Sequence, residues 1–386
     1  IIVTNGLIIS GGTLAKATFT LNMTTLTMSG GDLTSTSGNV VITGAMNISA
    51  VGSAIDFGSE TWTVSGAFDC ESTDTAVWES GTGSILFDSA TGDATFTPCN
   101  FTSESHFNNI EFDSTAITGQ TWTLVTRALV YGGTGTIEDS GAEVVANTWS
   151  TGLDLAITGG SLIVGNGGIF TANASTVTLT AVTMTGGVDG TITVTTGAWT
   201  VSGNWNTSGA SSTYTQGTGI VTFDATATIT LLSTDNTFDD LTISTGTVTL
   251  ATAVVVTNAL TISGGTLAKS TFAITSAGSR TMSGGDLTST SGNVVITGAV
   301  NISSTSSIDF GSEIWTVSGT WTNITSDTFT WDAGTGTITF DSAIGGTMTF
   351  RGDVLGEAEF NSVTFTSSGV TAQTFTMSGA EGLRWL

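Results

Sequence analysis

The chain has 386 residues, of which 39% are apolar and only 10% are charged. Its net charge is −25, because it contains 31 acidic and only 6 basic side chains. This balance excludes nucleic-acid binding, since no basic stripe is present to neutralise phosphates, and it predicts repulsion from anionic membrane surfaces. No apolar run reaches the roughly 18 residues of a membrane-spanning helix, so no such span is expected.

Residues 259–319 nearly repeat residues 6–66. The matched segments lie 253 positions apart, the difference between 262 and 9: Ile9–Lys16 with Ile262–Lys269, and Ile55–Glu60 with Ile308–Glu313. A weaker copy lies between them, and three modules result, at residues 1–148, 149–256 and 257–386 (incomplete). Self-similarity of this kind predicts an array or solenoid. Because the chain begins and ends inside a module, we expect a neighbouring subunit or flanking sequence to supply the missing coils.

The first module holds the two cysteines, Cys70 and Cys99, whose counterparts in the third are Asn323 and Gly352. In an extracellular setting they can form a disulfide, and otherwise they are two buried thiols. The single histidine, His106, lies in a polar stretch, and we interpret it as a loop residue. With one histidine and two cysteines, no repeated His/Cys metal site can form.

The second module shows strand alternation most clearly, in Thr176–Thr180 and Thr191–Thr195. A period of two places threonine on one face and an apolar residue on the other. Strands of about five residues are separated by glycine-containing turns.

Recurring acidic residues offer the only route to catalysis, through close carboxylate pairs acting on polysaccharides. Asp239 and Asp240 are the only adjacent aspartates, and their counterparts are Asn108-Asn109 and Asn361-Ser362, which cannot transfer protons. We therefore interpret the pair as a structural corner. Three further aspartates recur at strand ends and are interpreted in the same way, with calcium binding as the alternative: Asp88, Asp224 and Asp341. No catalytic residue, cofactor or metal site is predicted.

A Trp-Thr-Val-Ser-Gly motif recurs in all three modules, beginning at Trp62, Trp199 and Trp315. Its position in alternating strands predicts core packing, and stacking on sugars is the alternative. We expect the three strands to occupy equivalent places.

The fold prediction is all-β, an elongated parallel β-solenoid (β-helix) built from three imperfect modules. Paired glycines recur after 19, 27 and 20 residues (11 to 30, 159 to 186, 264 to 284), which fits one coil per interval. Tandem β-sandwiches are the alternative, although the single proline, Pro98, is unusual for sandwich loops.

The segments Leu260–Leu267 and Gly217–Asp224, with Phe238–Ile243, resemble the repeats of large secreted β-strand-repeat surface proteins. That group includes autotransporter passengers and filamentous-haemagglutinin-type adhesins of microbes. The resemblance covers essentially the whole chain, is one of repeat style, and transfers no functional residues. It implies an extracellular or cell-surface, elongated, non-enzymatic protein.

These observations favour an acidic structural repeat protein, the subunit of a surface filament, stalk or sheath that self-associates end to end. An adhesin that binds glycans or surfaces is the first alternative, and a β-helix enzyme acting on polysaccharides is the second.

Overall fold

The computed structural model describes most of the chain. The residues outside the description are 50–52, 72–77, 80, 89–91, 100–108, 114–120, 125–128, 132–135, 141–146, 152–154, 158–160, 166–167, 180–182, 187–189, 233, 326–330, 342–346, 353–358, 369–373, 379–383 and 386.

Within the described residues there are 47 strands and no helix, so none of them forms a helix able to cross a membrane. Strands pair in parallel from one coil to the next, and the fold is a β-solenoid of about 12 turns. The solenoid prediction is confirmed. The tandem-sandwich alternative is wrong, because sandwiches are built from antiparallel sheets.

The chain divides into two compact units: residues 1–199 with 206–217, and residues 200–205 with 218–386. Two short strands, β24 (Trp199–Val201) and β25 (Trp205–Thr207), contain residues of both units.

The first unit contains the strands β1 (Ile2–Ile9), β2 (Thr13–Ala17), β3 (Leu21–Met28), β4 (Asp32–Ser35), β5 (Val40–Ile42), β6 (Met46–Ile48), β7 (Ile55–Asp56), β8 (Thr61–Val64), β9 (Phe68–Cys70), β10 (Trp78–Glu79), β11 (Ser84–Asp88), β12 (Ala94–Thr97), β13 (Asn109–Asp113), β14 (Thr121–Leu124), β15 (Leu129–Tyr131), β16 (Thr136–Ser140), β17 (Asn147–Thr151), β18 (Leu155–Ile157), β19 (Ser161–Gly165), β20 (Gly168–Thr171), β21 (Val177–Leu179), β22 (Thr183–Gly186), β23 (Thr191–Thr193) and β26 (Thr213–Thr215).

The second unit contains the strands β27 (Ile220–Phe223), β28 (Ala227–Leu231), β29 (Thr237–Ile243), β30 (Thr247–Leu250), β31 (Val254–Ile262), β32 (Thr266–Ser270), β33 (Ile274–Ser276), β34 (Arg280–Met282), β35 (Asp286–Ser289), β36 (Val294–Ile296), β37 (Val300–Ser304), β38 (Ile308–Asp309), β39 (Ile314–Val317), β40 (Trp321–Thr325), β41 (Trp331–Asp332), β42 (Thr337–Asp341), β43 (Thr347–Gly352), β44 (Glu359–Phe360), β45 (Val363–Thr366), β46 (Thr374–Ser378) and β47 (Arg384–Trp385).

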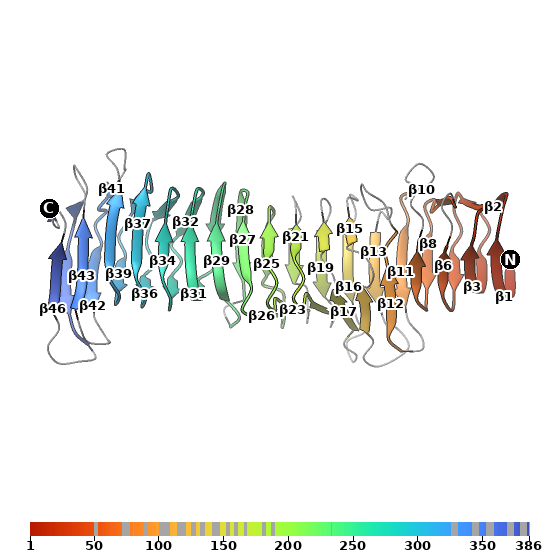
Figure 1. The fold of residues 1–386 in the computed structure, drawn as a ribbon, viewed down its shortest axis with the longest axis horizontal. Helices are drawn as coiled ribbons and strands as arrows, with labels where there is room; N and C mark the ends of the chain where they lie inside the picture. Colours follow the sequence, from red (N-terminus) through yellow and green to blue (C-terminus); the bar gives the residue numbers. More distant parts are fainter. Residues whose placement is uncertain are drawn as a thin grey trace. The chain divides into compact units, whose positions relative to one another are not determined.

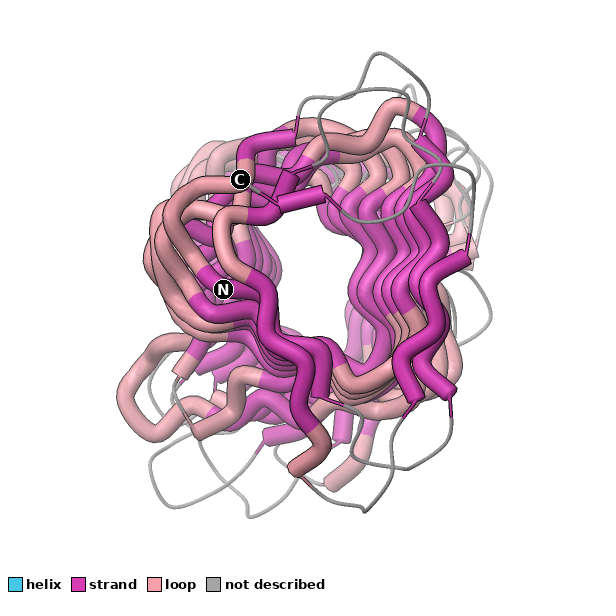
Figure 2. The backbone as a smooth tube through the Cα atoms, turned by 90° about the vertical axis from the view of Figure 1, so that its left-hand side faces the viewer, coloured by secondary structure: helices cyan, strands magenta, loops and turns pink. Residues whose placement is uncertain are grey.

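The coils of each unit stack strand on strand. In the first unit β5 pairs with β8 and β8 with β11, which brings Val40, Trp62 and Ile85 into one inward row. In the second unit β36, β39 and β42 stack in the same way, and Figure 1 shows them as successive parallel arrows. Seen end-on, the coils nearest the viewer in Figure 2, which belong to the second unit, superpose closely.

Alternation in the sequence explains the inward rows. In β36 the first and last residues, Val294 and Ile296, are fully buried, while Val295 between them is not. Because side chains alternate across a strand, one residue in two faces the interior, and stacking buries it against the coils on both sides. Most of the described side chains in the interior of each unit are therefore apolar.

Candidate functional site

The three repeated tryptophans lie in the interior. Trp62 in β8, Trp199 in β24 and Trp315 in β39 all have 0% exposed surface. Two of them make the same aromatic contact, since Phe57 lies 4.7 Å from Trp62 and Phe310 lies 4.8 Å from Trp315, centroid to centroid. None of the three indoles is accessible to a sugar.

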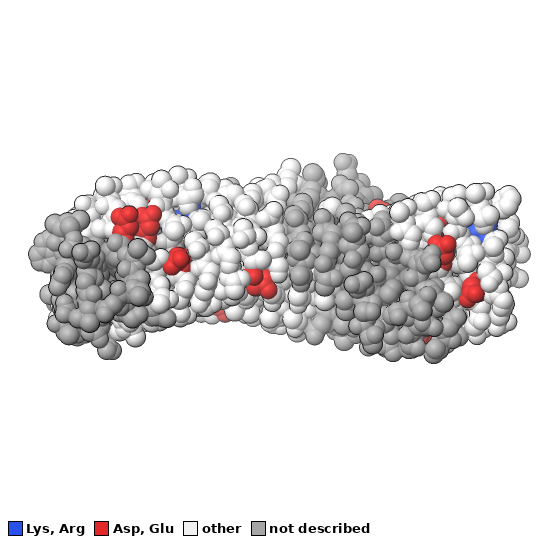
Figure 3. Space-filling view, turned by 90° about the horizontal axis from the view of Figure 1, so that it is seen from above, with Lys and Arg blue, Asp and Glu red and all other residues white. Residues whose placement is uncertain are grey.

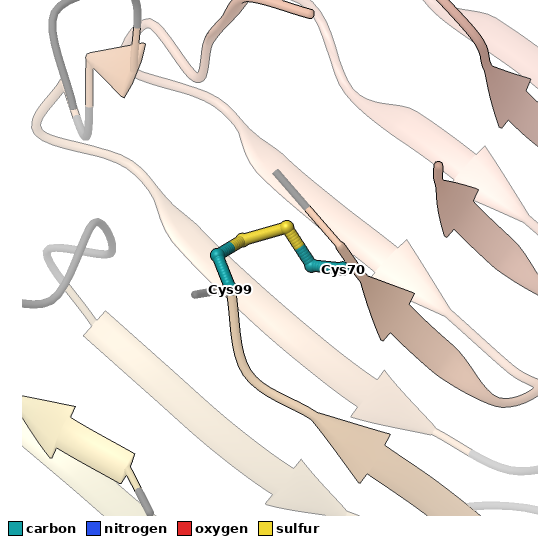
Figure 4. The surroundings of a disulfide bond; sticks show 2 residues. All are labelled: Cys70 and Cys99. Carbon is teal, nitrogen blue, oxygen red and sulfur yellow. A yellow bond between two sulfur atoms is a disulfide. The ribbon is translucent and has the colours of Figure 1, made fainter. Parts of the chain in front are cut away.

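The two cysteines form a disulfide in the first unit. Cys70 ends β9, and Cys99 follows β12, the strand that pairs with β9 on the next coil. The bond therefore joins neighbouring coils across a sequence separation of 29 residues (Figure 4).

The acidic residues singled out in the sequence are hydrogen-bond acceptors between coils. Asp239 and Asp240 lie inside β29, at an irregularity in its register with β31, whereas a corner was expected. Asp239 accepts from the Thr257 hydroxyl and Asp240 from the Ala259 amide, both at 2.9 Å. The pair lies opposite a bulge in β31, because Phe238 pairs with Val256 and Asp240 with Ala259. The extra residue is therefore in β31, and a side-chain oxygen of the pair satisfies the Ala259 amide beside it.

Two of the three strand-end aspartates also accept hydrogen bonds from another coil. Asp88 and Asp341 are the last residues of β11 and β42, and Asp224 directly follows β27. Asp341 accepts from the amide and hydroxyl of Ser368, and Asp224 accepts from the Ser202 hydroxyl. His106 lies outside the described residues. In the part of the chain that the structure describes, no group of three or more His, Cys, Asp or Glu residues is placed to hold a metal ion.

The chemically most unusual feature is a buried charge cluster in the first unit, formed by Lys16, Glu60 and Trp62 and called here the first cluster. The Lys16 ammonium lies 3.3 Å from Glu60 Oε1, and both side chains are 1% exposed. Trp62 donates its indole N–H to the same oxygen at 3.1 Å. Lys16 also donates to the carbonyls of Ser37 (2.8 Å) and Gly38.

The second cluster repeats this arrangement in the second unit with Lys269, Glu313 and Trp315. Lys269 Nζ lies 3.6 Å from Glu313 Oε1, both side chains are fully buried, and Trp315 donates to Oε1 at 3.0 Å. Lys269 also donates to the carbonyls of Ser291 (2.6 Å) and Gly292 (2.5 Å). The recurrence in sequence is thus a recurrence of a charged centre.

Local structure explains how a lysine comes to point inward. Leu267 and Lys269 alternate with Ala268 in β32, so the strand turns both of them to the interior. The glutamate is held by the corner before it, where Gly311 has a positive φ of 56°. A Cβ at Gly311 would collide with Oε2 of Glu313, so only glycine fits there. Gly58 (φ 60°) does the same for Glu60.

The clusters differ in one neighbour. Arg280 in β34 is 1% exposed, and its guanidinium lies 4.9 Å from the Trp315 ring centroid. Its Nη2 donates to Met282 Sδ at 3.0 Å, while Nε and Nη1 have no hydrogen-bond partner among the described residues. Burial lowers the pKa of Arg280 to about 9. Burial also lowers the pKa of Lys269, the charge of Arg280 adds to that effect, and Glu313 opposes it.

The repeated segments of the sequence contain these lysines and glutamates, but the sequence pattern does not pair them. A signal was available: Lys16 and Lys269 are the only lysines in the chain, and they occupy matching positions of the repeat. A charge that recurs in so uncharged a chain indicates a fixed environment.

Comparisons with protein-family models, with curated proteins and with solved structures return no match to this chain.

Proposed function

We propose that the chain is a structural repeat segment of an extracellular protein, part of a filament, stalk or sheath on a microbial surface. The observation that carries this proposal is that packed side chains fill the interior of the described coils. Coil after coil is filled with buried apolar and aromatic side chains, and the repeated motifs supply packing, turns and coil-to-coil bonds. In a chain built in this way, the repeats serve to extend and stiffen the solenoid.

Two further observations support the proposal. The Cys70–Cys99 disulfide fits an oxidising, extracellular compartment, because reducing compartments keep thiols free. On the face shown in Figure 3, the described surface is mostly uncharged, with separate acidic patches and little exposed basic surface. Such a surface permits close packing of neighbours once salt screens the net charge.

The geometry of the coils supports self-association. Each coil pairs its backbone with the coil on either side, and parallel strand edges template further pairing unless something covers them. We propose end-to-end homopolymers as the assembly.

Electron microscopy and light scattering of the purified, oxidised chain at moderate salt test this proposal, with ordered polymers as the expected result. Particles that stay monomeric at every concentration would contradict it. If those monomers bound immobilised glycans, the adhesin would replace the filament, and release of reducing sugar from polysaccharides would favour an enzyme.

A further inference from the structure

The two lysines of this chain are its only side-chain primary amines, and each is buried against a glutamate. The amines lie 3.3 and 3.6 Å from the facing carboxylate oxygens. Strands and corners of a packed solenoid hold both groups in place. An amine and a carboxyl group that the fold holds next to each other react within one molecule, with effective concentrations far above those in solution.

The surroundings of the lysine orient its nitrogen. Three backbone carbonyls accept from Lys16 Nζ, those of Ser37 and Gly38 and, at 3.4 Å, that of Phe19, and the Lys269 amine has the matching set. A neutral amine has two N–H bonds, which the two nearer carbonyls can accept, and its lone pair is then free to face the glutamate. At Lys269, burial lowers the pKa of the amine, which favours its neutral form.

The surroundings of the glutamate favour attack at its carboxyl carbon. Oε1 of each glutamate accepts an indole N–H, from Trp62 or Trp315, which is the donor that a developing oxyanion needs. Oε2 of both Glu60 and Glu313 is buried and has no hydrogen-bond donor among the described residues. Oε1 is thus positioned to remain as a carbonyl oxygen and Oε2 to leave.

We propose that Lys16 and Glu60, and likewise Lys269 and Glu313, join as intramolecular amide bonds, the two clusters being the precursors. The ammonium transfers one proton to the carboxylate, which gives a neutral amine and a carboxylic acid. Nζ then attacks Cδ, and the C–Oε2 bond breaks as Oε2 receives the second amine proton. One water molecule leaves, and no oxidant or reductant is required.

The reaction relieves an electrostatic cost. A buried ion pair is expensive because both charges have left water, and an amide carries neither charge. The amide oxygen retains the tryptophan donor, and the amide N–H retains a carbonyl acceptor. Each bond would link β2 to the corner before β8, or β32 to the corner before β39. This inference concerns the covalent structure of the chain and stands independently of the proposed function.

Intact-mass measurement of the purified, denatured and reduced full chain tests the proposal directly. We expect a mass lower than that of the sequence by two water molecules. We also expect an amine-reactive reagent to leave both lysine side chains of the denatured chain unmodified. A full sequence mass with both lysines labelled would overturn the proposal and leave two ion pairs.

Variants assign each bond. Lys16→Met and Lys269→Met should each reduce the deficit to one water, and the double variant should abolish it. Glu60→Ala should make Lys16 reactive, and Asp240→Asn, the matched control, should keep the full deficit. A deficit that persists in the double lysine variant would overturn the proposal. A deficit of one water with one labelled lysine would restrict the bond to the other cluster. Because the chain is denatured before measurement, a poorly folded variant is still informative.

Discussion

The first and second clusters both accommodate a buried lysine in a solenoid core, but with different neighbours. Each pairs its lysine with a glutamate whose Oε1 also receives a tryptophan N–H. They differ at one repeat position, where the first unit has Leu26 and the second has Arg280, each directly before Thr-Met-Ser-Gly-Gly. Both residues are buried. The first cluster therefore balances its buried charges, whereas the second has one extra cation beside it.

That difference shows how a repeat absorbs charge. The lysine is accommodated by hydrogen bonds that the backbone of the next coil supplies in both units. Arg280 has no comparable set, and its described contacts are Met282 Sδ and the face of Trp315. Trp315 thus serves the carboxylate and the extra cation, whereas Trp62 serves only the carboxylate.

The largest expected effect comes from removing the shared tryptophan. Trp62→Ala and Trp315→Ala should each lower the free energy of unfolding by about 3–5 kcal/mol, through the cavity alone. Trp315→Ala should cost more, because it also removes the ring beneath Arg280. Chemical denaturation measures the loss of unfolding free energy in each variant, and native-state hydrogen exchange assigns that loss to one unit. Equal losses for the two variants would show that the cation–ring contact contributes nothing.

Removing the glutamate of one cluster comes next. Glu313→Leu leaves Lys269 and Arg280 both buried without a carboxylate and prevents the proposed Lys269–Glu313 amide bond, and removal of one partner of a buried pair alone costs about 3–5 kcal/mol. The double variant Lys269→Met/Glu313→Leu should recover the part of that loss that comes from the unpaired lysine. Glu60→Leu is the matched variant, and its smaller cost would follow from the absence of a second cation. Denaturation midpoints of the three variants, compared with that of the native chain, measure these losses of stability.

The units also differ in the disulfide, because Asn323 stands at the Cys70 position of the third module. Replacing both cysteines by serine should cost about 2–4 kcal/mol, since the cross-link no longer restricts the unfolded chain. Hydrogen exchange should accelerate around β9 and β12 and remain unchanged in the second unit. Unaltered protection of β9 would contradict a stapling role.

A smaller gain is expected from Arg280→Leu, which copies the first unit. Removing an unpaired buried cation should stabilise the second unit by about 1–2 kcal/mol. The pKa of Arg280 is lowered from its ordinary value to about 9, so the folded state loses its proton first as the pH rises. The cost of the charge is therefore complete below pH 9 and diminishes as the pH rises above 9, and the advantage of the variant should shrink with it. A gain that did not depend on pH would assign the effect to packing.

Much of this fold is readable from the sequence because its information is local. Alternation within segments such as Thr191–Thr195 predicts strands, and the interval between paired glycines predicts the coil. The partner of Lys16 could not be derived in this way. Glu60 is distant in sequence, and the contact depends on the corner at Gly58 and on how many residues each intervening corner absorbs. The bulge opposite Asp239 was missed for a similar reason, since an extra residue in a register is visible only when both strands are placed.

The smallest effect is expected at that bulge. In Asp239→Asn/Asp240→Asn each side chain keeps an oxygen that can accept from Thr257 or Ala259, so the hydrogen bonds at 2.9 Å should survive. The third module already has Asn361 and Ser362 at the matching positions, and Asn361 donates to the carbonyls of Thr335 and Gly336. The free energy of unfolding should therefore change by less than about 0.5 kcal/mol. The same variant should leave assembly intact, as judged by electron microscopy. If polymers or a polysaccharide-cleaving activity disappeared while stability stayed constant, these carboxylates would have a role beyond the bulge, and the interpretation of the acidic pair as structural would be wrong.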